Sequence, residues 1–226
     1  MESSTPQFET EIFAAERQWE LEGVPVLTAT VSLPQPTASD RTARRVRRYY
    51  RAQARAYLRY CDRFLLPTAA AACRAALEAS RPLPQFRAEL THRVTFNSGG
   101  FWSLYTQSRE AEADGSTLLR RWGDTWDLRT GYPAELRSFF PRRSGWKRLL
   151  LETAETEIRR QEAAGFARYH PGWRRGLRRF FNPLHYYLTE EGLAFFYSMY
   201  AIAPAATGIP TFVCPWSELR GTASAS

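Results

Sequence analysis

The stretch between His185 and Trp216 constrains the fold most, because short apolar runs alternate there with turn residues. Residues 185–188 have strand character, and the following Thr189-Glu190-Glu191-Gly192 has the composition of a hairpin turn. Residues 193–200 (LAFFYSMY) are predicted to be an aromatic return strand, and residues 211–216 a last strand. The pattern predicts an antiparallel β-ribbon in the C-terminal part of the chain.

A helix is predicted before this ribbon. Its apolar stripe, at helical spacing, consists of Trp146, Leu149, Leu150, Ala154 and Ile158. Ser144 is the candidate N-cap and Gly165 the expected end. Residues 171–181 are predicted to form a second, short helix. Since an apolar stripe needs cover, we expect the ribbon to pack beneath the longer helix.

The N-terminal half begins with residues 1–22, which are polar and have helical propensity, so we expect a frayed or helical leader. Residues 24–33 (VPVLTATVSL) are predicted to be a strand. Ser39 or Asp40 is a candidate cap for an amphipathic helix that Pro67 is expected to break, with residues 68–80 forming a second helical piece. The apolar positions of the first helix are Val46, Tyr50, Tyr57, Cys61 and Phe64.

Three further runs, residues 86–97, 101–107 and 116–128, predict an antiparallel sheet in the middle of the chain. The whole chain therefore predicts an α+β fold with antiparallel sheets and helices packed on one face. We expect a polar leader (1–22), one domain (23–219) and a disordered tail (220–226). The domain is expected to consist of two intimately joined subregions, 23–140 and 141–219.

The chain carries 31 basic and 23 acidic residues, a formal net charge of +8 that favours anionic partners. Lys147 is the single lysine, so the arginine content reflects either codon bias or selection for phosphate or carboxylate binding. The three cysteines, Cys61, Cys73 and Cys214, form no CxxC motif and suit a reducing compartment. With neither a signal peptide nor a membrane-spanning run visible, we expect a cytoplasmic protein.

No catalytic constellation is apparent in the sequence. There is no GxSxG motif, and His92, His170 and His185 are dispersed, so we interpret them as structural. Neither paired cysteines nor HxxxH or HxH spacings occur, so we expect no metal and no cofactor. The adjacent Glu190 and Glu191 fit a solvated hairpin tip better than an acid–base pair. We therefore expect a protein that is not an enzyme.

Two surfaces are candidate binding sites. An arginine run could bind anions or nucleic acid through Arg44, Arg48 and Arg55, although a solvated helix face explains it as well. The run consists of Arg41, Arg44, Arg45, Arg47, Arg48, Arg51, Arg55, Arg59 and Arg63. The aromatic strand at 195–200 is first of all core, but its outer face could hold a ligand. The candidate residues of that outer face are Tyr197, Met199, Tyr200 and Pro204.

A resemblance to a known family rests on the order and spacing of apolar, turn and proline residues. The matching residues are Tyr187-Leu188-Thr189-Glu190-Glu191-Gly192-Leu193, Phe196, Tyr200, Ile202-Ala203-Pro204, Gly208-Ile209-Pro210 and Pro215-Trp216-Ser217-Glu218-Leu219. They resemble the signature of the RsiV/PdaC-like domain family, which includes the sensor domain of RsiV-type anti-sigma factors and the accessory domain of PdaC-type deacetylases. The resemblance implies an α+β binding or sensor-like domain of unknown ligand.

The resemblance also bears on partners and alternatives. RsiV-type relatives bind lysozyme, but lysozyme is basic like this chain, and like charges disfavour docking. An unknown protein or an anionic cell-wall ligand fits the charge better, with nucleic acid as a less favoured partner. The alternative functions are a cell-wall-related hydrolase and nucleic-acid binding through the arginine-rich helix at 41–63.

Overall fold

The computed structural model describes residues 8–111 and 115–220, and the expected tail beyond residue 220 lies outside this range. Within it, the strands form a six-stranded sheet of order β1-β2-β3-β4-β5-β6 and a three-stranded sheet of order β7-β8-β9. The fold is therefore mixed α+β, as predicted. The strands are β1 (Thr10–Leu21), β2 (Val24–Pro36), β3 (Phe86–Ser98), β4 (Phe101–Ala111), β5 (Thr117–Asp127), β6 (Tyr132–Pro133), β7 (Tyr186–Leu188), β8 (Gly192–Phe196) and β9 (Thr211–Pro215).

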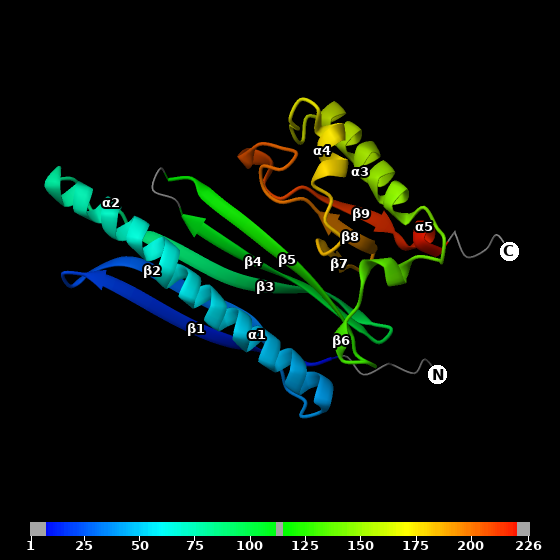
Figure 1. Ribbon diagram of the computed structural model, residues 1–226, viewed down its shortest axis with the longest axis horizontal. Helices are drawn as coiled ribbons and strands as arrows, with labels where there is room; N and C mark the ends of the chain where they lie inside the picture. Colours follow the sequence, from blue (N-terminus) through cyan, green and yellow to red (C-terminus); the bar gives the residue numbers. More distant parts are fainter. Residues whose placement is uncertain (1–7, 112–114, 221–226) are drawn as a thin grey trace. The chain divides into compact units, whose positions relative to one another are not determined.

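Helices lie between β2 and β3, between β6 and β7, and after β9 in chain order (Figure 1). They are α1 (Arg41–Tyr60), α2 (Leu66–Glu78), α3 (Trp146–Ala163), α4 (Trp173–Arg179) and α5 (Trp216–Arg220). Shorter helical turns are η1 (Cys61–Leu65), η2 (Leu136–Phe139) and η3 (Ala205–Thr207). No helix in the described part of the chain is both long enough and apolar enough to cross a membrane.

The chain divides into two compact units, and strands β3, β4 and β5 contribute residues to both. The N-terminal unit contains the described residues of Phe8–His92 and Thr106–Leu119. The C-terminal unit contains Arg93–Tyr105 and the described residues from Arg120 onward.

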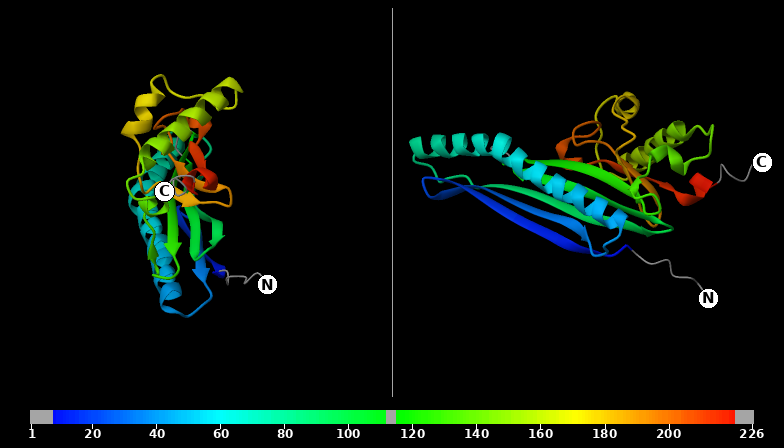
Figure 2. Two further views of the ribbon diagram at one scale, coloured as in Figure 1. Left: turned by 90° about the vertical axis from the view of Figure 1, so that its right-hand side faces the viewer. Right: turned by 60° about the horizontal axis from the view of Figure 1, so that its bottom comes forward.

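In the N-terminal unit, α1 packs along one face of β2, and Figure 2 shows this helix lying along the strands. Asp40 caps α1 by accepting a hydrogen bond from the Ala43 amide, as its position predicted. Alternate residues of β2 and successive turns of α1 supply the buried side chains between them. These side chains are Leu27, Ala29, Val31, Leu33, Ala43, Val46, Tyr50, Ala54 and Tyr57.

The expected helical leader is wrong, because residues 10–21 form strand β1, which pairs antiparallel with β2 along its whole length. Trp19 is buried there, and its indole N–H donates to the Asp62 carboxylate at 2.8 Å. Pairing with a neighbouring strand therefore overrides the local helical propensity of this segment. Strand β2 also pairs in parallel with β3, which the α1–α2 crossover between them permits.

The expected helix break at Pro67 is also wrong. A π-helical turn, η1, precedes the proline, and in it the Leu66 amide donates to the Cys61 carbonyl. The proline then occupies the first turn of α2, where a missing amide hydrogen costs little. The helical path therefore continues, and Phe64, placed on the apolar stripe by its spacing, is 56% exposed.

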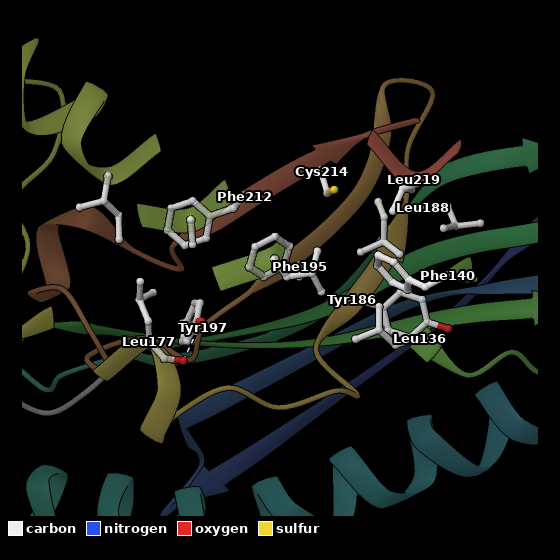
Figure 3. Packing of buried hydrophobic residues seen from close by; sticks show 14 of the residues in the cluster. Leu136, Phe140, Leu177, Tyr186, Leu188, Phe195, Tyr197, Phe212, Cys214 and Leu219 are labelled. Atoms are coloured by element: carbon white, nitrogen blue, oxygen red, sulfur yellow. Dashed lines mark hydrogen bonds between the residues drawn. The ribbon is translucent and has the colours of Figure 1, made fainter. Parts of the chain in front are cut away.

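The C-terminal unit has the three-stranded sheet packed against α3 and α4 (Figure 3). The predicted hairpin at residues 189–192 is confirmed: the Thr189 amide donates to the Gly192 carbonyl. Leu150, Ala154 and Ile158 of α3 are buried, as their spacing predicted, but α3 begins after Gly145 and Ser144 is not its cap. The sheet side of this core comes from Tyr186, Leu188, Leu193, Phe195, Tyr197, Phe212 and Cys214.

Candidate functional site

A groove in the C-terminal unit is lined by residues of helix α3 and strand β9. These two elements lie side by side (Figure 1). Its volume is about 510 Å³. We call it the α3–β9 groove and define it by its lining residues. These are Leu149, Glu152, Thr153, Thr156 and Glu157 from α3, Thr211, Phe212, Val213 and Pro215 from β9, and Glu218 from α5.

The helical wall of the groove follows from the spacing of α3. Its lining residues recur every three or four positions and so lie on one side of the helix. The buried residues Leu150, Ala154 and Ile158 form the neighbouring stripe, which packs on the sheet. One stripe of α3 therefore packs on the sheet, and the neighbouring stripe lines the groove.

The other wall is the outer edge of β9. The Trp216 amide donates to the Glu191 carbonyl and the Tyr197 amide to the Pro210 carbonyl. With the observed register, in which Cys214 lies opposite Leu193, the main-chain groups of Phe212 and Cys214 face β8. Those of Thr211 and Val213 therefore point to the other edge, and no strand within residues 8–111 and 115–220 pairs there.

The charge of the groove is opposite to that of the chain. Three carboxylates, from Glu152, Glu157 and Glu218, line it, and none of its lining residues is basic. Arg160 donates to Glu157 at 2.7 Å, and this interaction lowers the pKa of the carboxyl group, which is therefore ionised at neutral pH. Glu152 lies 3.6 Å from Arg148 in an exposed pair, where attraction is weak.

Only part of the predicted aromatic patch is exposed to solvent. Strand β8 ends at Phe196, and Tyr197 is 1% exposed instead of projecting outward, so that part of the prediction is wrong. Its side chain points into the core because it follows the same alternation as Leu193 and Phe195. The Tyr197 hydroxyl donates to the Leu177 carbonyl at 2.9 Å (Figure 3).

The remaining residues of that patch lie in the turn after β8. Tyr200 is 48% exposed and adopts a positive φ of 68°, which is rare for a residue with a Cβ atom. Met199 and Pro204 are half-buried. The α3–β9 groove is lined by none of these three side chains.

The predicted anion-binding residues Arg44, Arg48 and Arg55 are all exposed on α1. This helix contains eight arginines and no acidic residue. Arg47 donates to the carbonyls of Pro36 and Ala38 and therefore has a structural role in the loop before the helix. Among the described residues, no carboxylate lies within ion-pair distance of Arg48 or Arg55.

The histidines occupy separate places. His92 contacts the Ser32 carbonyl through Nδ1 at 2.9 Å in the N-terminal unit. His185 lies in the C-terminal unit, where its ring stacks on Phe196 with centroids 4.8 Å apart. Burial lowers the pKa of the His185 imidazole, so the neutral form is favoured. His170 is exposed.

The three cysteines are free thiols and all are buried. Burial raises the pKa of the Cys61 thiol to about 12 and that of Cys214 to about 11, so both are protonated at neutral pH. At the hairpin tip, hydrogen bonding from Thr189 lowers the pKa of the exposed Glu191 carboxyl group. Within the described ranges, no cluster of three or more potential ligand side chains could hold a metal ion.

Sequence reasoning missed the α3–β9 groove. One signal was present: Thr153 and Thr156 lie inside a helix on the stripe next to the apolar one, an unusual place for β-branched polar residues. Pro215 was another, because proline within a sheet is confined to edge strands and strand ends. Neither signal shows which helix borders which strand edge.

Comparisons with known proteins agree with the fold. The structure resembles a crystal structure of a DUF3298 family member from Bacteroides fragilis, with a TM-score of 0.67 and 14% identity over 96% of this chain and 94% of that one. A DUF3298 family protein from Pseudomonas aeruginosa matches with a TM-score of 0.57 and 16% identity over the same shares. No curated protein matches the sequence.

The family comparison covers the segment that contains the groove. Residues 138–217 match the model described as "Protein of unknown function (DUF3298)", and all lining residues except Glu218 fall inside this range. The RsiV/PdaC-like resemblance stays a prediction. Residues 138–217 of this chain are thus similar to the DUF3298 family, whose function is unknown.

Proposed function

We propose that this chain is a non-catalytic binding domain whose ligand occupies the α3–β9 groove. The observation that carries the proposal is the combination of a helix wall, three carboxylates and a strand edge around a cavity of about 510 Å³. No strand in the described part of the chain pairs with that edge. Concave sites with a few convergent polar groups are where proteins commonly bind ligands.

The state of the reactive side chains supports a non-catalytic role. A thiol with a pKa of about 11 or 12 is a poor nucleophile at neutral pH, since the thiolate is the reacting form. His185 is stacked on an aromatic ring and belongs to a different unit from His92. The cell-wall-related hydrolase alternative would be favoured by a cleft that gathers a histidine, a carboxylate and a nucleophile, and the groove lining contains no histidine.

A sensor-like role of the RsiV/PdaC type is the finer form of this proposal. It rests on the sequence resemblance around residues 187–219, which includes the β9 segment and Glu218. A cytoplasmic location likewise stays a prediction from the sequence.

A peptide selection tests the proposal. A linear peptide library displayed on phage is selected on the intact protein, and the enriched clones are assayed on two variants of α3. Thr156→Trp fills the groove, whereas Glu162→Trp places the same bulk on an exposed position outside the lining. We expect enriched clones to lose binding to the first variant only. Absence of enrichment, or equal binding to both variants, would reject the groove as a ligand site.

A second candidate function, binding of nucleic acid through α1, is favoured by the acid-free arginine face of that helix. Its test is titration with duplex DNA at 50 and 200 mM salt. Replacing Arg44, Arg48 and Arg55 with glutamine should weaken binding and reduce the slope of log K against log salt by about 3, since each phosphate contact contributes about 1. Glutamine at three exposed arginines of the C-terminal unit is the charge-matched control: Arg168, Arg175 and Arg178. An equal effect of both triple variants would assign the binding to net charge alone.

A further inference from the structure

We infer that the α3–β9 groove binds an extended basic peptide, which adds to the outer edge of β9 as a fourth strand. This inference rests on the proposed function, because it names the class of ligand and the way in which the same groove holds it. Two independent features of the groove carry it: the hydrogen-bonding pattern of β9 and the charge of the lining.

The hydrogen-bonding pattern requires an extended partner. Thr211 and Val213 direct their main-chain N–H and C=O groups away from β8, and Val213 is 38% exposed. An added strand satisfies such a row of alternating donors and acceptors, whereas a helix satisfies its own main-chain groups internally. The main-chain groups of β9 therefore select an extended peptide.

The length of strand β9 limits the length of the peptide that can pair with it. Strand β9 has five residues, which corresponds to about 17 Å of extended chain. Pro215 has no N–H group, and the chain turns directly into α5 at Trp216. At the other end, the Pro210 carbonyl accepts from the Tyr197 amide and so faces β8, which makes Thr211 the first residue of the outer edge. A peptide of about five residues matches the part of the edge that can form hydrogen bonds.

The negative charge of the groove lining favours basic side chains on the peptide. Alternate side chains of an added strand would face α3, on the side of the sheet where Phe212 and Cys214 point. The carboxylates of Glu152 and Glu157 line that wall, and Glu218 lines the groove from α5. Lysine or arginine at alternate peptide positions would place cations beside these carboxylates, whereas an acidic segment would be repelled. No lining residue is basic, and the arginines that pair with Glu152 and Glu157, Arg148 and Arg160, lie outside the lining.

The probe for this inference is a fluorescein-labelled peptide, acetyl-Lys-Val-Lys-Val-Lys-amide, titrated into the intact protein by fluorescence polarisation. Two matched peptides accompany it. One carries N-methyl groups on alternate residues along the bonding edge, which removes its donors and keeps its charge. The other has glutamate in place of lysine. We expect the unmodified lysine peptide to bind at least tenfold more tightly than either of them.

Protein variants locate the site. Glu152→Arg should weaken binding of the lysine peptide at least fivefold, whereas Glu162→Arg, the same charge change on an exposed residue of α3 outside the lining, should change it less than twofold. In NMR spectra of labelled protein, the Val213 amide should shift on binding and exchange more slowly with solvent. The expected readout is thus specific to the outer edge of β9.

The outcomes separate this inference from the proposed function. Equal binding of the lysine peptide and its N-methylated form overturns strand addition, and equal effects of the two arginine variants overturn the charge assignment. If phage selection yields groove-dependent clones while the lysine peptide fails to bind, the binding-domain proposal survives and the basic-strand inference is rejected. If neither selection nor probe yields binding at the groove, both are rejected.

Discussion

The Trp216 side chain closes the β7–β8 hairpin by donating its indole N–H to the Thr189 carbonyl at 3.2 Å. The Glu190 carbonyl shares the same donor at 3.1 Å. The first residue of α5 therefore holds a turn that lies 26 to 27 positions earlier in the chain. The Trp216 ring also contacts that of Phe96, with centroids 5.9 Å apart.

We expect Trp216→Phe to keep part of the ring packing and to lose this hydrogen bond. The expected loss is about 1 kcal/mol of the free energy of unfolding, since a typical hydrogen bond contributes that much net. Urea unfolding followed by circular dichroism measures it. Trp122→Phe is the control, because Trp122 is 41% exposed, and a loss of similar size in both variants would contradict the role of the Thr189 contact.

The Tyr197 hydroxyl is the second group whose role differs from its sequence interpretation. We expect Tyr197→Phe to destabilise the protein by about 1 to 2 kcal/mol, because the buried Leu177 carbonyl loses its donor. Tyr200→Phe removes an exposed hydroxyl and should leave the urea midpoint nearly unchanged. If Tyr197→Phe were as stable as the parent protein, Tyr197 would not be a structural residue of the core.

The parts of the fold that could be predicted are those determined by neighbours in sequence. The spacing of Leu150, Ala154 and Ile158 is enough to predict a helix. The composition of the turn before Gly192 is enough to predict a hairpin. The arginine run likewise placed Arg44, Arg48 and Arg55 on an exposed face.

The parts that were missed depend on contacts between distant residues. Strand β1 forms because β2 offers it a pairing edge, which outweighs its helical propensity. Tyr197 was assigned to the outer face of an aromatic strand, but its side chain points to the same side as Leu193 and Phe195 and enters the core. The α3–β9 groove brings together residues 149–157 and 211–218, a juxtaposition that local patterns do not encode.

Gly123 of β5 lies close to the backbone of Tyr186 of β7. A Cβ atom at Gly123 would lie 1.9 Å from the Tyr186 carbonyl oxygen, and its addition requires the backbone to move. We expect Gly123→Ala to cost about 3 kcal/mol or more of the free energy of unfolding, or to prevent folding. Gly145→Ala is the matched control, because the nearest atom to a Cβ there is 3.8 Å away. Thermal unfolding of both variants gives the comparison, and similar midpoints would refute the close approach.

The His185 imidazole should make stability depend on pH. Burial lowers its pKa in the folded state, so the unfolded chain, with a histidine pKa of about 6.5, binds the proton more readily. Stability associated with neutral His185 is therefore fully present above about pH 6.5 and is lost as the pH falls through the lower folded pKa. His185→Phe keeps a ring to stack on Phe196 and removes the titration, so its urea midpoint should fall less between pH 7 and pH 5 than that of the parent. The exposed His170 is the control, and the urea midpoint of His170→Gln should fall between pH 7 and pH 5 as much as that of the parent protein. If the midpoint of His185→Phe fell by the same amount as that of the parent, groups other than His185 would cause the pH dependence.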